Sequence, residues 1–69
     1  MIFYVYMLKS VKNGIIKTYV GYTNNLNLRL KKHNAGSGAK STRGYKWKII
    51  YKKRFYDKRL AMSFEYKLK

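Results

Sequence analysis

The sequence predicts a small α+β domain with the element order β-β-α-β-α, in which a three-stranded antiparallel or mixed sheet is flanked by helices. Two observations lead to this prediction. Three short runs are rich in aromatic and β-branched residues, and two segments carry apolar residues at helical spacing. The 69 residues suffice for one domain, spanning residues 1–69. The chain has no cysteine, so packing alone must stabilise its core.

The first two runs predict an antiparallel hairpin. Residues Ile2–Leu8 are apolar on both faces, which favours a central strand covered on both sides. Asn13-Gly14 is the strongest short hairpin signal in the chain. Ile15–Gly21 is therefore expected to be the returning strand.

A helix is expected next, at Leu26–His33, after a cluster of capping residues. Its apolar stripe consists of Leu26, Leu30 and His33. The following segment, Asn34–Gly44, holds three of the five glycines and no large apolar residue, which predicts a loop.

A third strand and a second helix complete the domain. The strand is expected at Trp47–Phe55, with Trp47, Ile49 and Tyr51 sharing one face. Asp57 is suited to be the N-cap of the last helix. The apolar residues of this helix recur at helical spacing, at Leu60, Ala61, Phe64 and Leu68.

The charge of the chain is extreme, with 17 Lys and Arg against two acids and a net charge of +15. Such self-repulsion disfavours the compact state unless an anionic partner is present. Together with the many aromatic residues, the charge favours a nucleic acid, whereas a ribosomal or an anionic-membrane partner is the alternative. There is no apolar run long enough for a membrane span, and Met1–Leu8 lacks the features of a signal peptide. We expect a soluble cytoplasmic protein.

The two acids have different candidate roles. The Asp57 carboxylate can accept the free N–H groups at the start of the last helix. Glu65 lies in the middle of that helix and flanks its apolar stripe. It could form an ion pair with Lys69 at the i+4 position, or it could hold a divalent cation, because Mg²⁺ accepts as few as one or two carboxylates.

Other side chains suit the binding or cleavage of phosphodiesters. Arg29 can bind two phosphate oxygens and remain charged, but the residues alone do not separate it from Arg43, Arg54 or Arg59. A tyrosine near cations can accept a proton, although most of the eight tyrosines must pack in the core. His33 is equally suited to packing and to proton transfer.

The glycine-rich loop offers further phosphate contacts. Gly36–Gly44 lacks the Walker spacing and is not a P-loop. Its backbone N–H groups, with Lys40 and Arg43, could contact nucleic-acid phosphates, or the segment could be a flexible linker. Lys31 and Lys32, on the first helix, are further candidates for nucleic-acid binding.

Five motifs in order resemble the GIY-YIG endonuclease superfamily. They are similar to its small stand-alone members, which are related to the nuclease domain of the excision-repair endonuclease. Each motif is weak alone, but together they cover almost the whole chain. They are Tyr4-Val5-Tyr6, Tyr19-Val20-Gly21, the helix around Arg29, the loop Gly36–Gly44, and the run Leu60–Lys67 with Glu65.

The resemblance implies a role for each matching residue. Glu65 would hold one Mg²⁺ or Mn²⁺, and Tyr19 would be the general base or would orient the attacking water. Tyr6 would form hydrogen bonds in the same pocket, and Arg29 would stabilise the pentacovalent phosphorus. Lys32 and His33 would be supporting candidates.

Three features depart from the family pattern. Tyr4 stands where the family name has glycine, and Tyr22 stands where the excision-repair relatives have lysine. The chain ends at Lys69, four residues after Glu65, which suggests a C-terminally shortened domain.

The leading hypothesis is a metal-dependent endonuclease that hydrolyses DNA phosphodiester bonds in repair or recombination, with RNA as a further substrate to consider. A partner protein or a homodimer would supply specificity. The first alternative is a non-catalytic nucleic-acid-binding module of the same fold, with exposed Trp47 or tyrosines stacking on bases. The second is a basic structural protein of the ribosomal type.

Overall fold

The protein consists of a three-stranded sheet and two helices, seen in a computed structural model that describes residues 1–36, 42 and 44–69. The order β-β-α-β-α is confirmed, and both strand pairings are antiparallel, so the sheet is not mixed. No helix within the described ranges is long and apolar enough to cross a membrane. The elements are β1 (Phe3–Lys12), β2 (Ile15–Thr23), α1 (Leu26–Asn34), β3 (Lys48–Phe55) and α2 (Lys58–Leu68).

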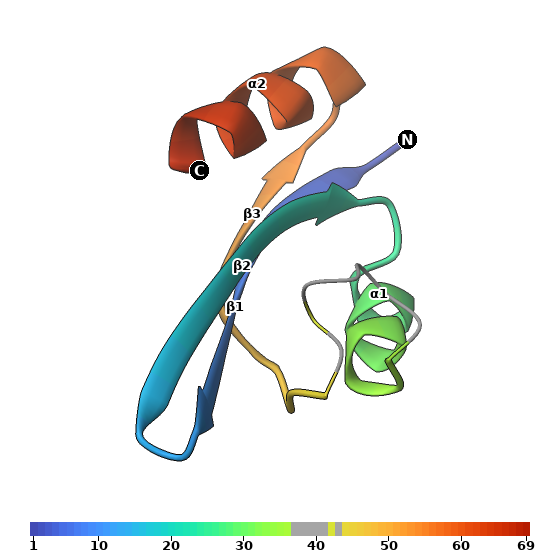
Figure 1. Ribbon diagram of the computed structural model, residues 1–69. Helices are drawn as coiled ribbons and strands as arrows, with labels where there is room; N and C mark the ends of the chain where they lie inside the picture. Colours follow the sequence, from blue (N-terminus) through green and yellow to red (C-terminus); the bar gives the residue numbers. More distant parts are fainter. Residues whose placement is uncertain (37–41, 43) are drawn as a thin grey trace.

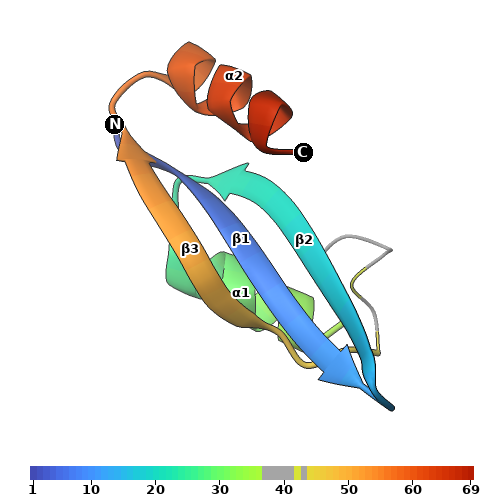
Figure 2. The same cartoon turned by 90° about the vertical axis from the view of Figure 1, so that its left-hand side faces the viewer.

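Strand β1 is the central strand, as predicted, and lies between β2 and β3 (Figure 2). It is longer than expected, because Lys9–Lys12 pair with β2 all the way to the turn. Asn13 and Gly14 have φ values of 53° and 77°, the positive angles that a two-residue hairpin turn requires. Such a tight turn keeps the polar residues beside it in the ladder, which the apolar pattern alone does not indicate.

The two helices cover opposite faces of the sheet (Figure 1). On the α1 face, Tyr6 and Leu8 are buried and pack with Trp47, Leu26 and Leu30. A second group of aromatic rings lies on the α2 face. There the Phe64 ring is 5.3 Å from the Phe55 ring and 6.4 Å from the Tyr51 ring, centroid to centroid. Burial on both faces explains why β1 is apolar throughout its first half.

The prediction that Tyr51 shares a face with Ile49 is wrong. Leu8 pairs with Ile49 and Met7 pairs with Tyr51, so Ile50 is an extra residue in a β-bulge. The bulge turns Ile49 toward α1 and Tyr51 toward Phe64 of α2. A strict two-residue alternation cannot indicate such an insertion.

Trp47 is not exposed, in contrast to the expectation that it could stack on bases. Its side chain is 5% exposed, and its indole Nε1 donates to the carbonyl oxygen of Thr42 at 2.9 Å. Its backbone N–H donates to the Asn34 side chain, so β3 begins one residue later than predicted, at Lys48. Asn34 is itself the last residue of α1, which is one residue longer than expected.

Candidate active site

Gly21 makes room for the Tyr6 side chain. The two residues are direct partners in the β1–β2 ladder, so any side chain on Gly21 would point to the same face as Tyr6. A Cβ atom added there would lie 2.7 Å from Tyr6 Oη and 3.0 Å from Tyr19 Cε2. The glycine therefore allows both tyrosine rings to lie close to this point of the sheet.

The Tyr6 hydroxyl begins a buried chain of hydrogen-bonding groups. Tyr6 Oη lies 3.0 Å from His33 Nε2, and His33 Nδ1 lies 2.9 Å from Thr42 Oγ1. All three side chains are at most 1% exposed. Since the carbonyl oxygen of Thr42 also accepts the indole N–H of Trp47, the chain links β1, α1 and the segment before β3.

His33 is a buried side chain with partners at both ring nitrogens, one of the two roles that its sequence position left open. Burial lowers the pKa of His33 below its usual value of 6.5, and the charge of Arg29 lowers it further. A neutral imidazole carries one donor and one acceptor nitrogen, which suits a hydroxyl group on each side.

Tyr19 lies beside this chain on β2. Its ring centroid is 4.8 Å from that of His33 and 6.3 Å from that of Tyr6. Unlike Tyr6, Tyr19 is only partly buried. The two tyrosines of the two sequence motifs are thus neighbours, one enclosed and one accessible.

Arg29 extends from α1 toward the tyrosines. Its pKa is raised, chiefly by hydrogen bonding with Tyr6, and interaction with Tyr19 contributes. Its buried Nε has no hydrogen-bond partner in the described part of the chain. Arg29 also lines a pocket of about 380 Å³ together with Phe3, Tyr22, Thr23, Asn24 and Lys58. The guanidinium group therefore lies between the buried phenol and a solvent-accessible space.

Glu65 approaches from α2, on the other face of the sheet. Its side chain is 16% exposed, and its Oε2 lies 3.3 Å from Lys69 Nζ, which is the i,i+4 ion pair anticipated as one of its roles. Burial raises the pKa of Tyr6, hydrogen bonding with Arg29 opposes this, and the charges of Tyr19 and Glu65 raise it further. Glu65 is therefore within electrostatic range of Tyr6.

The acidic ligands at this place are few. Among the described residues, no group of three or more His, Cys, Asp or Glu side chains could hold a metal ion. Such a donor set does not suit zinc, which needs three or four protein ligands. It fits Mg²⁺, which can be held by one or two carboxylates while keeping several waters. Glu65 is the carboxylate that the structure brings to the tyrosines.

The basic candidates are partly placed. Lys31 and Lys32 are exposed on the last turn of α1, and Lys32 lines a pocket of about 200 Å³ with Arg29. Lys40 and Arg43 lie outside the described residues. Sequence reasoning overlooked Lys58, which lines the larger pocket together with Tyr22 and Arg29. Its position directly after the N-cap Asp57 was the signal that it would lie at the start of α2.

Two tyrosines on a hairpin, one enclosed and one accessible, join an arginine on α1 and a glutamate on α2 to define a small α+β domain with one composite site. The chain belongs to the GIY-YIG family, because the model of the GIY-YIG catalytic domain matches residues 2–69. Its relatives include small stand-alone proteins of this family.

Three similar proteins illustrate this relationship. A UPF0213 protein of Oceanobacillus iheyensis is 45% identical over 67 residues, covering 96% of this chain and 74% of that protein. One from Clostridium perfringens is 48% identical over 67 residues, covering 96% of this chain and 69% of that protein. The solution NMR structure of the UPF0213 protein BH0048 from Bacillus halodurans is 40% identical, with a TM-score of 0.54. That alignment covers 99% of this chain and 70% of the NMR chain.

Proposed function

We propose that this protein is a metal-dependent endonuclease that hydrolyses DNA phosphodiester bonds, in repair or recombination. The observation that supports this most is the convergence of Tyr6, Tyr19, Arg29 and Glu65, which come from β1, β2, α1 and α2. Membership of the GIY-YIG family supports it independently.

The two tyrosines have different tasks in this proposal. Tyr6 is buried, its pKa is raised by that burial, and its hydroxyl contacts His33, so it stays neutral and positions its neighbours. Tyr19 is accessible, so it accepts the proton of the attacking water or orients that water. Arg29 remains charged and stabilises the negative charge that develops on the phosphate oxygens.

Glu65 would hold one Mg²⁺ or Mn²⁺ ion. Such an ion, when bound, supplies charge stabilisation at the scissile phosphate and at the leaving oxygen. Lys69 must then leave the Glu65 carboxylate. That step is inexpensive, since the Lys69 side chain is 57% exposed and exposed ion pairs contribute about 0–1 kcal/mol.

The basic surface would bind the nucleic-acid backbone. With a net charge of +15, the chain can neutralise several phosphates, and we assign such contacts to Lys31, Lys32, Lys40 and Arg43. Charge alone does not separate DNA from RNA. A partner protein or a second copy would supply specificity, and the cytoplasmic location remains a prediction.

Substitution of Glu65 tests the proposal. Labelled single-stranded, duplex and branched DNA would be incubated with wild type, Glu65→Gln and Lys69→Gln in Mg²⁺, Mn²⁺ or EDTA. We expect metal-dependent cleavage by wild type and Lys69→Gln. We expect no cleavage by Glu65→Gln, although it still binds DNA. Lys69→Gln is the matched control, because it breaks the same ion pair and leaves the carboxylate in place.

A non-catalytic binding module is the second candidate. The ion pair between Glu65 and Lys69 favours it, because this pair gives the carboxylate a structural partner. Tight binding without cleavage in any metal, equal for wild type and Glu65→Gln, would select this candidate and exclude the nuclease.

A further inference from the structure

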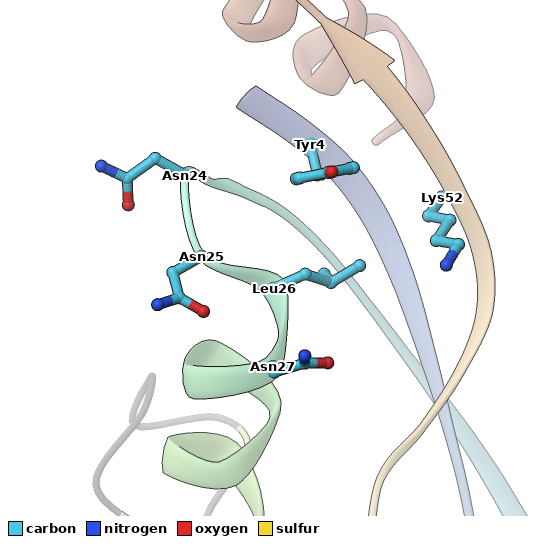
Figure 3. A pocket seen from close by; sticks show the side chains of 6 residues that line it. All are labelled: Tyr4, Asn24, Asn25, Leu26, Asn27 and Lys52. Atoms are coloured by element: carbon cyan, nitrogen blue, oxygen red, sulfur yellow. The ribbon is translucent and has the colours of Figure 1, made fainter. Parts of the chain in front are cut away.

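We propose that a second pocket, between β1, α1 and β3, binds an unpaired nucleobase next to the phosphate held at the candidate active site. This inference deepens the proposed function, since the base belongs to the strand that the site would bind. The pocket has a volume of about 280 Å³ (Figure 3). It is lined by Tyr4, Asn24, Asn25, Leu26, Asn27 and Lys52.

The shape of the pocket suits one planar ring system. Its volume lies just below the ~300–1,000 Å³ of pockets that enclose drug-sized ligands. Leu26 and Asn27 extend from α1 toward the strands, and the Tyr4 ring lies across the space from them (Figure 3). A phenol ring offers the flat face on which any base can stack, and the aliphatic Leu26 offers an apolar surface.

The polar groups of the pocket have different commitments. Asn25 is needed for the fold, because its Oδ1 accepts the Leu28 N–H at 3.2 Å and caps α1. Asn24 contacts the sulfur of Met1. Tyr4, Asn27 and Lys52 come from three different elements, and none of them makes a side-chain hydrogen bond or ion pair within the described part of the chain. These three side chains are available to a ligand.

The available groups match the chemistry of a nucleotide. The Asn27 amide carries both a donor and an acceptor, which can pair with the edge of a base. The Lys52 ammonium group can pair with the adjoining phosphate. A base stacked on Tyr4 cannot stay paired in a duplex, so the strand must be single, frayed or branched at this nucleotide.

The position of the pocket connects it to the candidate active site. Tyr4 and Tyr6 are two residues apart on one face of β1, which places them about 7 Å apart, on the scale of one nucleotide step. Lys52 is the direct partner of Tyr6 in the β1–β3 ladder. Asn24 lines both this pocket and the Arg29 pocket, so the two spaces adjoin at the start of α1.

The test measures binding separately from cleavage. In EDTA, the affinity for a labelled single-stranded oligonucleotide would be measured by fluorescence anisotropy, with each base in turn replaced by an abasic site. The proteins would be wild type, Tyr4→Leu, Tyr4→Phe and Asn27→Ala. Tyr66→Leu is the matched control, since Tyr66 is 80% exposed on α2 and outside this pocket.

We expect Tyr4→Leu to weaken binding about 5- to 150-fold, the range of one stacked base, while Tyr4→Phe and Tyr66→Leu bind as wild type does. We expect the abasic site to weaken wild type at one position, and Tyr4→Leu to lose nothing more there. Asn27→Ala, at an exposed residue, should weaken binding without affecting the fold.

Three results would overturn the subsite. They are equal binding by Tyr4→Leu, Asn27→Ala and Tyr66→Leu, an abasic effect at no single position, or displacement of the oligonucleotide by inorganic phosphate at this pocket. Cleavage is scored independently. Cleaving wild type without a Tyr4 effect would refute the subsite alone, and a Tyr4 effect without cleavage in any metal would refute the nuclease alone.

Discussion

Gly21 controls the geometry of the tyrosine pair. In Gly21→Ala, the new Cβ would approach Tyr6 Oη to 2.7 Å, and the Tyr6 ring, 1% exposed and bonded to His33, has little room to move. We expect the free energy of unfolding to fall by about 1–3 kcal/mol, as for other overpacked cores. Chemical denaturation measures this change.

A double-mutant cycle isolates the clash. Because Tyr6→Phe removes the atom nearest to the added methyl group, Gly21→Ala should cost less in the Tyr6→Phe background than in wild type. Equal costs in both backgrounds would show that the close approach of Tyr6 to Gly21 is not the reason for the glycine.

His33 makes stability depend on pH. Its pKa is lowered by burial, so between pH 6.5 and the folded-state pKa the unfolded chain binds a proton that the folded chain does not. The free energy of unfolding should therefore be constant above about pH 6.5 and fall as the pH decreases below it.

Denaturation at a series of pH values checks this slope. His33 is the one histidine of the chain, so His33→Gln should flatten the pH dependence between about pH 5 and 7, whatever its own stability. An equal slope in wild type and His33→Gln would contradict the assignment.

At the residue scale, the sequence predicted more of the residue types than of their contacts. Tyr6, Tyr19, Arg29 and Glu65 were identified by the resemblance, and the structure brings them together. The contact of Thr42 with His33 carried no local signal, because it joins a loop residue to a helix. Their catalytic roles remain proposals.

Helix α2 carries Glu65 and is short, so its cap matters. Asp57 Oδ1 accepts the Arg59 N–H at 2.8 Å, as predicted from the sequence. We expect Asp57→Ala to lower the free energy of unfolding by about 0.5–2 kcal/mol, since it leaves this N–H without its acceptor. Thermal unfolding followed by circular dichroism measures the effect.

Asp57→Ser is the matched control for this helix, because it removes the same charge and keeps an oxygen acceptor. It should retain most of the stability that Asp57→Ala loses. Equal losses in the two variants would point to charge, not capping, as the contribution of Asp57.

At the element scale, prediction succeeded where the signal is local. The Asn13-Gly14 turn and the Asp57 cap depend on a few neighbouring residues, and both are confirmed. The bulge at Ile50 and the burial of Trp47 depend on partners elsewhere in the chain, so no local pattern announced them.

At the scale of the whole molecule, two designs share a very small chain. The sheet and helices bring a tyrosine pair, an arginine and a glutamate to one place. A net charge of +15 supplies affinity for the nucleic-acid backbone over the rest of the surface. Backbone affinity needs charge alone, whereas cleavage needs the convergence, so only a variant that preserves charge and fold can separate them.

Tyr19→Phe is that variant, because it removes one hydroxyl from an accessible ring and changes no charge at neutral pH. The decisive measurement is its single-turnover rate of DNA cleavage at saturating protein, beside wild type and Tyr66→Phe. The account predicts a loss of about 10²- to 10⁴-fold for Tyr19→Phe, with DNA affinity unchanged and Tyr66→Phe equal to wild type. Cleavage by Tyr19→Phe at the wild-type rate would contradict it.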